Sequence, residues 1–402
     1  MAPEVDQDPR ADDFVQNPYP FYHRVRRLGP AFRWQQYGHL CVAGFDDVNR
    51  LLRDRRFGRQ VLHLTTRSAL GWPEPEPKLA DFHAVERHSL LELEPPEHTR
   101  LRTLVTRAFV SRQVERLRPR IAALAHELID GFSGGQLDLL DAYATPIPVR
   151  VIAALLGINE GMAPQLLKWS HRLVAMYQFR RSSAEEASAN AAAIEFAAFI
   201  RAEIAQRRKQ PGDDLLSQLV GVSGDGGKLS ETEIISTVIL LLNAGHEASV
   251  HAIGNGVKAI LETGADPAKL FATPAATSAS IEETLRFDPP LHMFTRYALE
   301  HVVIGGERLK PGDQIGLMLG AANRDPTRYP DPDRFDPTRD ASGHTSFGAG
   351  IHFCLGAPLA RLEIEVALPI LFARLPKLAL AEAPRYRDTY HFHGLERLVL
   401  KI

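Results

Sequence analysis

A glycine-rich loop that runs directly into a helix is the feature that most constrains the fold of this chain. The loop, residues 347–356, contains Cys354, one of only two cysteines in 402 residues. Its glycines can adopt backbone angles closed to other residues and let a flat ligand come close; they are Gly348, Gly350 and Gly356. Residues 357–366 follow with the spacing of an amphipathic helix, and Pro358 is tolerated in its first turn. Cys354 is therefore expected at a helix N-terminus, where the helix dipole favours a thiolate.

A thiolate in this position suits a metal ligand or a nucleophile. A structural zinc site usually needs several cysteine or histidine ligands at short spacing, and Cys41 lies far upstream. A nucleophilic cysteine needs a basic partner, for which His352 is a candidate. A single axial thiolate to haem iron needs no second cysteine. Because the chain has no Cys-x-x-Cys-His motif, such a haem is expected to be held non-covalently.

The loop pattern Phe347-x-x-Gly350-x-His352-x-Cys354-x-Gly356 resembles the haem-binding loop of the cytochrome P450 superfamily, the haem-thiolate monooxygenases. The resemblance implies a soluble bacterial-type member that holds haem b, with the Cys354 thiolate as the axial ligand of the iron. Further implied cofactor contacts in the loop are Phe347, Gly348 and Gly356. The implied fold is mainly α with small β-sheets, and the haem lies between a long central distal helix and the proximal helix after the cysteine loop.

The composition is typical of one large domain. No stretch of low complexity or linker composition divides residues 1–402, so a single domain is expected. The 47 basic and 49 acidic residues nearly cancel, which argues against nucleic acid or an anionic membrane as partner. The polar, acidic N-terminus lacks the basic and apolar regions of a signal peptide, and no segment offers a long uncharged apolar run. We therefore expect a soluble cytoplasmic protein without a membrane span. We also expect a monomer.

Helical periodicity dominates from about Pro95 to Leu285, and it includes a block from Val114 to Phe132. Strand-like runs are confined to residues 30–45 and to the C-terminal third. In that third, strands are expected at 301–304, 314–319 and 397–402. Cys41, inside the first strand-like region, is expected to be a buried core residue.

The longest helix candidate runs from Ser230 to about Glu262 and starts with a capping box of sequence Ser-Glu-Thr-Glu. Residues 234–242 are apolar nearly all round, which indicates a buried helix through the middle of the domain. The segment 244–249, of sequence Ala-Gly-His-Glu-Ala-Ser, follows. Burial of its acidic residue, Glu247, is costly unless the carboxylate is paired, hydrated or functional.

Taken alone, Glu247 is typical of a helix residue that reaches an arginine or the surface. In the P450 superfamily, the long central helix crosses the distal face of the haem and carries a small-Gly-x-acid-Thr segment, which Ala244, Gly245 and Glu247 match. Gly245 costs helix stability relative to alanine but leaves room for a diatomic ligand beside the iron. Ala248 departs from the pattern, because most members have a threonine there that steers protons to iron-bound oxygen.

Ser249 supplies a hydroxyl one residue later, but one step turns a side chain by about 100° around a helix. We therefore do not expect it to replace the threonine directly. Three explanations stay open: proton delivery by ordered water with Glu247, delivery by a hydroxyl of the substrate, or chemistry without this relay. We favour water first and substrate second. The catalytic candidates are Gly245, Glu247, Ala248 and Ser249.

Glu283 and Arg286 place opposite charges at i,i+3 of one helix, which alone usually means a solvated surface pair worth a few tenths of a kcal/mol. Farther on, Pro332 and Arg334 resemble the Pro-x-Arg-Phe segment of the superfamily. That likeness implies that Glu283, Arg286 and Arg334 form a structural ion network behind the haem loop. Loss of one partner is then expected to destabilise the fold or haem retention.

The two propionates of a haem need cationic, forked donors. His98 and Arg102 lie at i,i+4 after a Pro-Pro helix start, which on its own indicates a solvated basic face. The superfamily directs a histidine and an arginine of this segment to the propionates, together with an arginine after a later Pro-Pro turn and the histidine of the cysteine loop. The haem contacts implied here are His98, Arg102, Arg296 and His352.

The chain has no nucleotide-binding fingerprint and no reductase-sized region, so electrons are expected from a separate partner. The resemblance implies a ferredoxin and a ferredoxin reductase that carry electrons from NAD(P)H. Basic residues on segments expected near the proximal face would receive an acidic ferredoxin, although each alone is typical of plain solvent exposure. They are Arg100, Arg107, Arg112 and Arg361.

Apolar and aromatic residues dominate the segments that contact substrate in the superfamily, which favours an apolar small molecule. These segments are Leu90 with Leu91, 176–179, Leu242 with Asn243, 291–294 and 390–393. A plain core role is an equal alternative for each apolar residue among them. The histidines of these segments are more typical of hydrogen-bonded loop residues than of metal ligands; they are His292, His391 and His393.

The implied activity is O2-dependent insertion of an oxygen atom into such a molecule, with the thiolate favouring O–O cleavage. One alternative is a peroxide-driven or rearranging haem-thiolate enzyme, which Ala248 makes more plausible. Another is a non-catalytic haem ligand sensor, against which the lack of an evident output domain counts. The substrate, the position oxidised and the native redox partner do not follow from the sequence.

Overall fold

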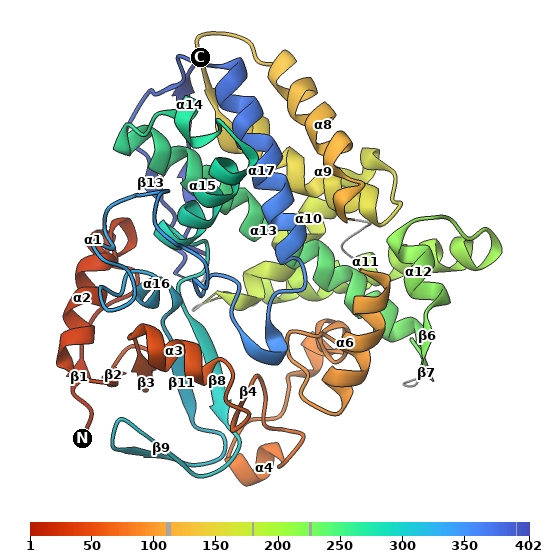
Figure 1. The fold of residues 1–402 in the computed structure, drawn as a ribbon. Helices are drawn as coiled ribbons and strands as arrows, with labels where there is room; N and C mark the ends of the chain where they lie inside the picture. Colours follow the sequence, from red (N-terminus) through yellow and green to blue (C-terminus); the bar gives the residue numbers. More distant parts are fainter. Residues whose placement is uncertain (110–113, 179–180, 225–226, 391) are drawn as a thin grey trace.

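The computed structural model describes residues 1–109, 114–178, 181–224, 227–390 and 392–402. Helices build most of the molecule, and a smaller sheet-containing part lies toward the N-terminus (Figure 1). The expected mainly α fold with small β-sheets is confirmed. Three residues singled out from the sequence, Arg112, Phe179 and His391, lie outside the described residues.

The central helix α13 (Glu231–Thr263) is the longest described helix and is buried along most of its length. It begins as predicted, because the Ser230 side chain accepts a hydrogen bond from the Glu233 backbone and the Glu233 side chain accepts one from the Ser230 backbone. The helices packed around it are α9 (Pro146–Leu155), α10 (Ala163–Val174), α11 (Ser183–Lys209), α15 (Pro274–Phe287) and α17 (Ala357–Arg374).

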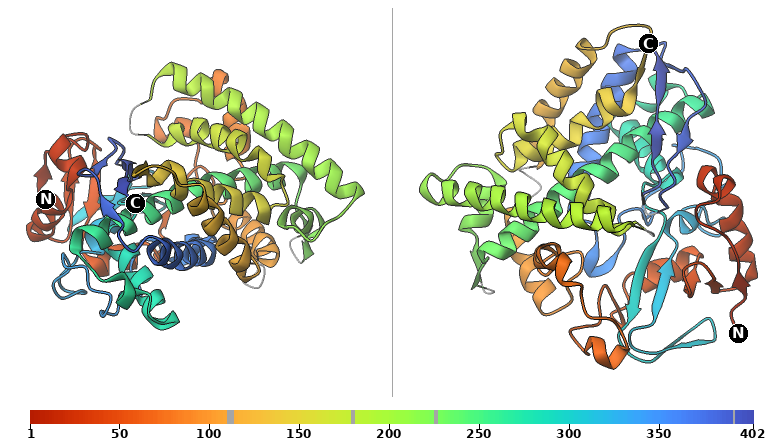
Figure 2. Two further views of the ribbon diagram at one scale, coloured as in Figure 1. Left: turned by 90° about the horizontal axis from the view of Figure 1, so that it is seen from above. Right: turned by 180° about the vertical axis from the view of Figure 1, so that it is seen from behind.

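The other α-helices lie around this centre and toward the N-terminus. They are α1 (Asp12–Gln16), α2 (Tyr19–Leu28), α3 (Phe45–Leu51), α4 (Arg67–Leu70), α5 (Ala80–Glu86), α6 (Glu97–Ala108), α8 (Arg118–Asp130), α12 (Leu215–Gly221), α14 (Pro267–Leu270) and α16 (Leu319–Ala322). The two views of Figure 2 place α1 and α2 at one end of the molecule and α11 toward the other. No helix among the described residues combines the length and apolar character that crossing a membrane requires.

The main sheet has the strand order β1-β2-β3-β11-β8-β4. Its strands are β1 (Glu4–Val5), β2 (Phe32–Trp34), β3 (His39–Val42), β11 (Gln314–Leu317), β8 (Phe294–Ala298) and β4 (Phe57–Gly58). β11 runs parallel to β3 and antiparallel to β8, so the C-terminal third closes onto the N-terminal hairpin. Cys41 on β3 is fully buried, as predicted.

Smaller pairings complete the structure. They are β9 (Val302–Ile304) with β10 (Glu307–Leu309), β12 (Ala379–Leu380) with β15 (Val399–Lys401) and β5 (Gln136–Asp138), β13 (Arg385–Tyr386) with β14 (Leu395–Arg397), and β6 (Ser223–Gly224) with β7 (Gly227–Lys228). Two predicted strands were too long. The strand at 314–319 ends at Leu317 because Leu319 already begins α16, and the run 397–402 is divided between β14 and β15.

Candidate active site

The cysteine loop joins the sheet-containing part to α17, and its tip lies beside α6 (Figure 1). Gly348 and Gly350 have φ of 65° and 70°, a region that glycine adopts readily and other residues rarely. A Cβ on Gly350 would lie 2.6 Å from the carbonyl oxygen of Leu52, so the loop also approaches that backbone too closely for a side chain. Gly356 differs from the expectation, because its φ of −80° is open to any residue.

Cys354 lies directly before α17, as predicted, and its backbone N–H donates to the carbonyl of Phe347 at 3.0 Å. Burial raises the pKa of the thiol, against the opposing effects of the Gly356 and Ala357 backbone N–H groups and of Arg102. The helix terminus thus favours the thiolate but does not outweigh burial. A cation on the sulfur, such as a metal ion, is needed to hold it ionised, which fits an axial ligand.

Three of the four predicted propionate contacts gather beside this loop. The rings of His98 and His352 lie 4.4 Å apart between centroids, and the buried Nε2 of His98 has no hydrogen-bond partner among the described residues. Arg296 is 3% exposed, and its Nη1 donates to the carbonyl of Thr295 at 3.0 Å. Burial lowers the pKa of Arg296 to about 9. The Arg296 guanidinium lies near His352, which packs against the unpartnered His98 ring, and this set of donors fits an anionic oxygen ligand, as a haem propionate would be.

Arg102, the fourth predicted contact, reaches the cysteine loop. Its Nη2 donates to the carbonyl of Phe353 at 2.8 Å. This contact ties α6 to the residue before Cys354. Burial lowers the pKa of Arg102, and Cys354 opposes that effect.

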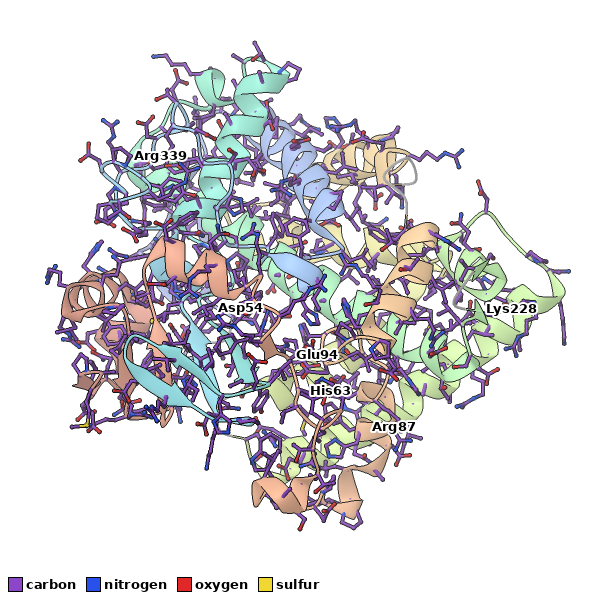
Figure 3. The ribbon with its side chains drawn as sticks, turned by 60° about the horizontal axis from the view of Figure 1, so that its bottom comes forward. Asp54, His63, Arg87, Glu94, Lys228 and Arg339 are labelled. Atoms are coloured by element: carbon purple, nitrogen blue, oxygen red, sulfur yellow. The ribbon has the colours of Figure 1, made fainter. Side chains whose placement is uncertain are left out.

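A carboxylate that the sequence analysis missed, Glu94, lies in the same place and is labelled near the middle of Figure 3. It is 4% exposed, and its Oε1 accepts from the backbone N–H of Arg59 at 2.5 Å and lies 3.1 Å from His352 Nε2. Burial alone would raise the pKa of Glu94, but His352 and the Arg59 N–H hold it below its ordinary value. An acidic residue between an apolar run and a Pro-Pro turn was the signal that could have identified it.

The predicted ion network behind the loop is present, but its third member was wrong. Arg286 and Glu283, both fully buried, form a two-pronged pair with Nε–Oε2 of 2.7 Å and Nη2–Oε1 of 2.8 Å. Arg339, labelled in Figure 3, completes it with Nε at 3.2 Å from Glu283 Oε1. The side chain of Arg334 is 67% exposed and pairs with Asp336 instead, because the turn directs its carbonyl inward and its side chain to solvent.

Arg286 and Arg339 also donate hydrogen bonds to main-chain carbonyls of the segment 330–334. Arg286 Nη1 donates to the carbonyls of Asn323 and Pro332 at 2.8 and 2.9 Å. Arg339 donates to the carbonyls of Pro330 at 2.6 Å, Asp331 at 3.0 Å and Arg334 at 3.1 Å. The segment is therefore held largely through its backbone.

On the distal helix, Glu247 is 9% exposed and is surrounded by histidines. Its Oε2 lies 3.3 Å from His246 Nε2 and 3.6 Å from His171 Nε2, and its Oε1 lies 3.4 Å from His251 Nε2 and 3.9 Å from Arg387 Nη1. Burial alone would raise the pKa of this carboxyl, but His246 and His251 hold it well below its ordinary range. The i,i+4 spacing of Glu247 and His251 was a signal that the sequence analysis did not use.

The neighbours of Glu247 on the same helix face other elements. Gly245 faces Ile152 of α9, whose Cδ1 would lie 3.7 Å from an added Cβ, an ordinary contact. Ser249 is buried and interacts with the Glu363 carboxyl of α17. Burial raises the pKa of Glu363 to about 8. Ser249 therefore lies toward the proximal helix α17, whereas Glu247 lies against His171 of α10.

Several candidate substrate contacts belong to buried networks. His292 Nδ1 lies 2.7 Å from the Tyr22 hydroxyl, and His393 Nε2 lies 3.5 Å from Asp288 Oδ1. The two histidine rings are 4.2 Å apart between centroids. Met293 belongs to a core cluster that contains Cys41 and aromatic residues of the N-terminal part.

Two of the candidate partner-binding arginines make ion pairs. Arg100 pairs with Glu233 at the start of α13, and Arg361 pairs with Glu282 through Nε at 2.5 Å and Nη2 at 2.9 Å. Arg107, on the last turn of α6, is exposed. Arg100 and Arg361 are half-buried, so Arg107 is the most exposed described arginine of this group.

The comparisons with known proteins agree with this geometry. A model of the cytochrome P450 family matches residues 275–377. Cytochrome P450 107B1 of Saccharopolyspora erythraea is 38% identical over 404 residues, covering 97% of this chain and 96% of that protein. Vitamin D(3) 25-hydroxylase of Pseudonocardia autotrophica is 39% identical over 400 residues, with coverages of 96% and 94%.

Solved structures share the fold along the whole chain. P450BioI, solved in complex with a fatty acid ligated to an acyl carrier protein, has a TM-score of 0.89 at 35% identity and covers 98% of this chain and 100% of its own. The Bacillus subtilis bacillaene polyketide synthase P450 PksS has a TM-score of 0.88 at 33% identity, with coverages of 98% and 99%. Identity at this level over nearly the full length shows that the chain belongs to the cytochrome P450 family of haem-thiolate monooxygenases.

Proposed function

We propose that this protein holds haem b through the Cys354 thiolate and inserts one oxygen atom from O2 into an apolar small molecule, with electrons from a ferredoxin and its reductase. The observation that carries the proposal is the half-buried Cys354 in a loop that lies beside His98, Arg296 and His352. A cysteine alone is compatible with other chemistry. A cysteine together with a buried cation that can bind a carboxylate is typical of a haem site.

The residues of the chain hold the cofactor and manage charge around it. When bound, a thiolate-ligated haem supplies the activation of oxygen. Arg296 would neutralise a propionate inside the protein, and His98 Nε2 would donate to an anionic oxygen of the cofactor. Arg102 fixes the loop directly before Cys354 by its hydrogen bond to the Phe353 carbonyl.

Glu247 is the proposed proton-handling group of the distal helix. Its Oε2 exchanges protons with ordered water, because Ala248 provides no hydroxyl and Ser249 interacts with Glu363. Replacing Ala248 by threonine is expected to change the product formed per electron pair only slightly, since the native relay is complete without it. A large gain in the Ala248→Thr variant, measured as product per NAD(P)H consumed, would contradict this relay.

The names of relatives support an apolar substrate. One is a vitamin D(3) 25-hydroxylase and another a 6-deoxyerythronolide B hydroxylase. The apolar candidates Leu90, Met176 and Leu242 are each less than 9% exposed, consistent with an apolar wall or core. Titrating the ferric protein with terpenoids, steroids, fatty acids and aromatics, and following displacement of iron-bound water by absorbance, would identify the class.

The experiment that tests the proposal combines an absorbance spectrum of the haem with an assay of substrate turnover. The reduced protein under carbon monoxide should show the red-shifted Soret band of a thiolate-bound haem, and Cys354→Ser should lose it. An identified ligand should then be oxidised with O2, ferredoxin and reductase, and only poorly with peroxide. Efficient peroxide turnover would favour the peroxide-driven alternative suggested by Ala248, and binding without turnover would favour a sensor.

A further inference from the structure

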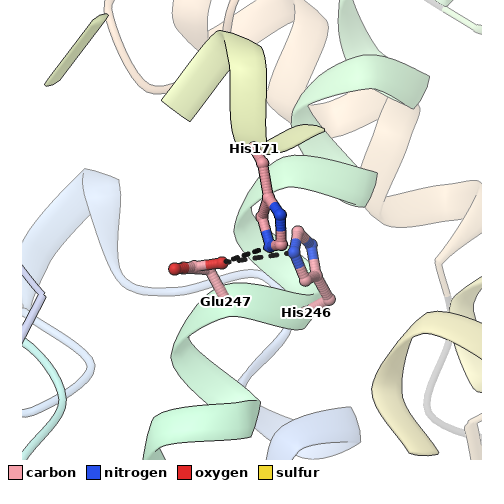
Figure 4. A group of neighbouring side chains, drawn as sticks. All are labelled: His171, His246 and Glu247. Atoms are coloured by element: carbon pink, nitrogen blue, oxygen red, sulfur yellow. Dashed lines mark ion pairs between the residues drawn. The ribbon is translucent and has the colours of Figure 1, made fainter. Parts of the chain in front are cut away.

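Three nitrogen and oxygen atoms converge between α10 and α13, on the face of the distal helix that carries Glu247 (Figure 4). His171 comes from α10, and His246 and Glu247 are consecutive on α13. One ligand atom of each residue lies within 4.8 Å of the other two, and the Nε2 atoms of His171 and His246 lie 3.6 and 3.3 Å from Glu247 Oε2. The two histidine rings are 5.7 Å apart between centroids.

The hydrogen bonding of His246 directs a lone pair into this space. Its Nδ1 lies 2.9 Å from the carbonyl oxygen of Leu242, which can only accept, so Nδ1 carries the hydrogen. With Nδ1 as the donor, Nε2 is the ring nitrogen that faces Glu247 Oε2, at 3.3 Å, and this buried Nε2 has no hydrogen-bond partner among the described residues; with its lone pair free, it is an acceptor facing an acceptor. Two acceptors that face each other in a buried place need a cation between them. A ring N–H donated to a backbone carbonyl is also the usual arrangement for a metal-binding histidine.

We propose that His171, His246 and Glu247 form a binding site for a zinc-like divalent ion, with ligand atoms Nε2, Nε2 and Oε2. Two imidazoles and one carboxylate are a donor set that zinc accepts, with a fourth position open to water. The side chain of His171 is 54% exposed, so the ion enters from solvent and this ligand can adjust. The second carboxylate oxygen is occupied by its own neighbours, His251 and Arg387, which orients Oε2 toward the site.

An ion bound at this site would inhibit the enzyme. It would link α10 to α13, which already pack together, and it would take up the carboxylate oxygen proposed above to exchange protons. This consequence for turnover rests on the proposed function, whereas binding of the ion does not. Zinc is expected to slow turnover of the metal-free enzyme.

The test uses the haem-loaded, tag-free protein and zinc sulfate alone. Calorimetry should show one zinc per chain, and His171→Ala should weaken binding at least about tenfold, because a direct ligand matters no less than the outer-shell groups that change affinity by about 10–100-fold. His301→Ala, at an exposed histidine beside β9, is the matched control and should bind as the wild type does. Magnesium should not compete, since it prefers oxygen ligands.

Diffraction at the zinc absorption edge should place an anomalous peak among the three ligand atoms. Zinc should slow turnover of the wild type, and it should leave turnover of His171→Ala unchanged relative to that variant's own metal-free rate. Equal zinc affinity of His171→Ala and wild type, a peak elsewhere, or the absence of stoichiometric binding would overturn the site and show that only a proton fills this space. Because binding is read by heat and diffraction, its failure would leave the haem assignment untouched, and failure of the carbon monoxide spectrum would leave the zinc result standing.

Discussion

The Glu283–Arg286 pair shows how strongly the stability of the fold can depend on side chains that lie outside the candidate active site. Both residues are fully buried, and Arg286 bonds Glu283 and the carbonyls of Asn323 and Pro332. Arg286→Ala should lower the free energy of unfolding by about 3–5 kcal/mol, because it leaves a buried carboxylate with one partner fewer. Chemical denaturation of the haem-loaded protein, followed by far-UV circular dichroism, measures this loss.

The matched comparison is between the two arginines farther along the chain. Arg339→Ala should also destabilise strongly, since Arg339 contacts Glu283, whereas Arg334→Ala should change stability by less than about 0.5 kcal/mol because its side chain is exposed. Equal losses in the two variants would show that Arg334 belongs to the network after all. Sequence likeness indicated Arg334, and only the direction of the turn, which tertiary packing decides, could distinguish the two.

Glu363 gives a pH-dependent prediction. Burial raises the pKa of its carboxyl to about 8, whereas an unfolded chain releases that proton near pH 4.3 or so. Between these values the folded state binds more protons than the unfolded state, so ionisation of Glu363 removes stability as pH rises. Glu363→Gln should therefore gain stability over the wild type at about pH 8.5 and show little gain at about pH 5. Thermal unfolding at the two pH values measures the difference, and parallel shifts at both would refute it.

At the scale of the element, the cysteine loop depends on a glycine that is needed for two reasons. Gly350 has a positive φ, and a Cβ there would meet the Leu52 backbone at 2.6 Å. Gly350→Ala should therefore reduce haem occupancy, read as the ratio of Soret to protein absorbance. Gly306→Ala is the control, because Gly306 also has a positive φ, of 84°, but no atom within 4 Å of an added Cβ. If both variants keep their haem, close approach of the loop to Leu52 is not what holds it.

The elements most accessible to prediction are those that local chemistry determines. The start of α13 follows from a capping box, and the helix after Cys354 follows from Pro358 and its apolar spacing. The ends of strands were less accessible, because Leu319 is apolar enough for β11 yet begins α16. The neighbours of Glu247 on α10 could not be predicted, since His171 is brought to it only by packing of two helices distant in sequence.

At the scale of the whole molecule, charge is nearly balanced, with 47 basic and 49 acidic residues. Electrostatic steering of a partner must then come from a local patch and not from the net charge. Arg107→Glu should slow reduction by an acidic ferredoxin several-fold at low salt, and the difference should shrink at about 1 M salt, where charges are screened within about 3 Å. Arg308→Glu, on the exposed β10 hairpin, is the control and should reduce at the wild-type rate in stopped-flow experiments. A rate for Arg107→Glu that matches the control would move the docking surface away from α6.

The architecture could be predicted well from the cysteine loop and the central helix, because a single prosthetic group requires both of them. The side-chain pairs between residues distant in sequence could not be predicted. Glu94 joins His352 across more than 250 positions, and Arg339 joins Glu283 across 56. Local periodicity contains no information on such pairings, which depend on how the sheet-containing part closes against the helices.

The way Arg286 and Arg339 hold the segment 330–334 has a consequence for variation in this part of the chain. Because the two guanidinium groups bind main-chain oxygens, which every residue has, an exposed side chain such as that of Arg334 can be exchanged without loss of these bonds. The number of residues cannot change in the same way, since an insertion would carry the carbonyls out of reach of both arginines. Tolerance here should therefore be high for substitution and very low for a change of length.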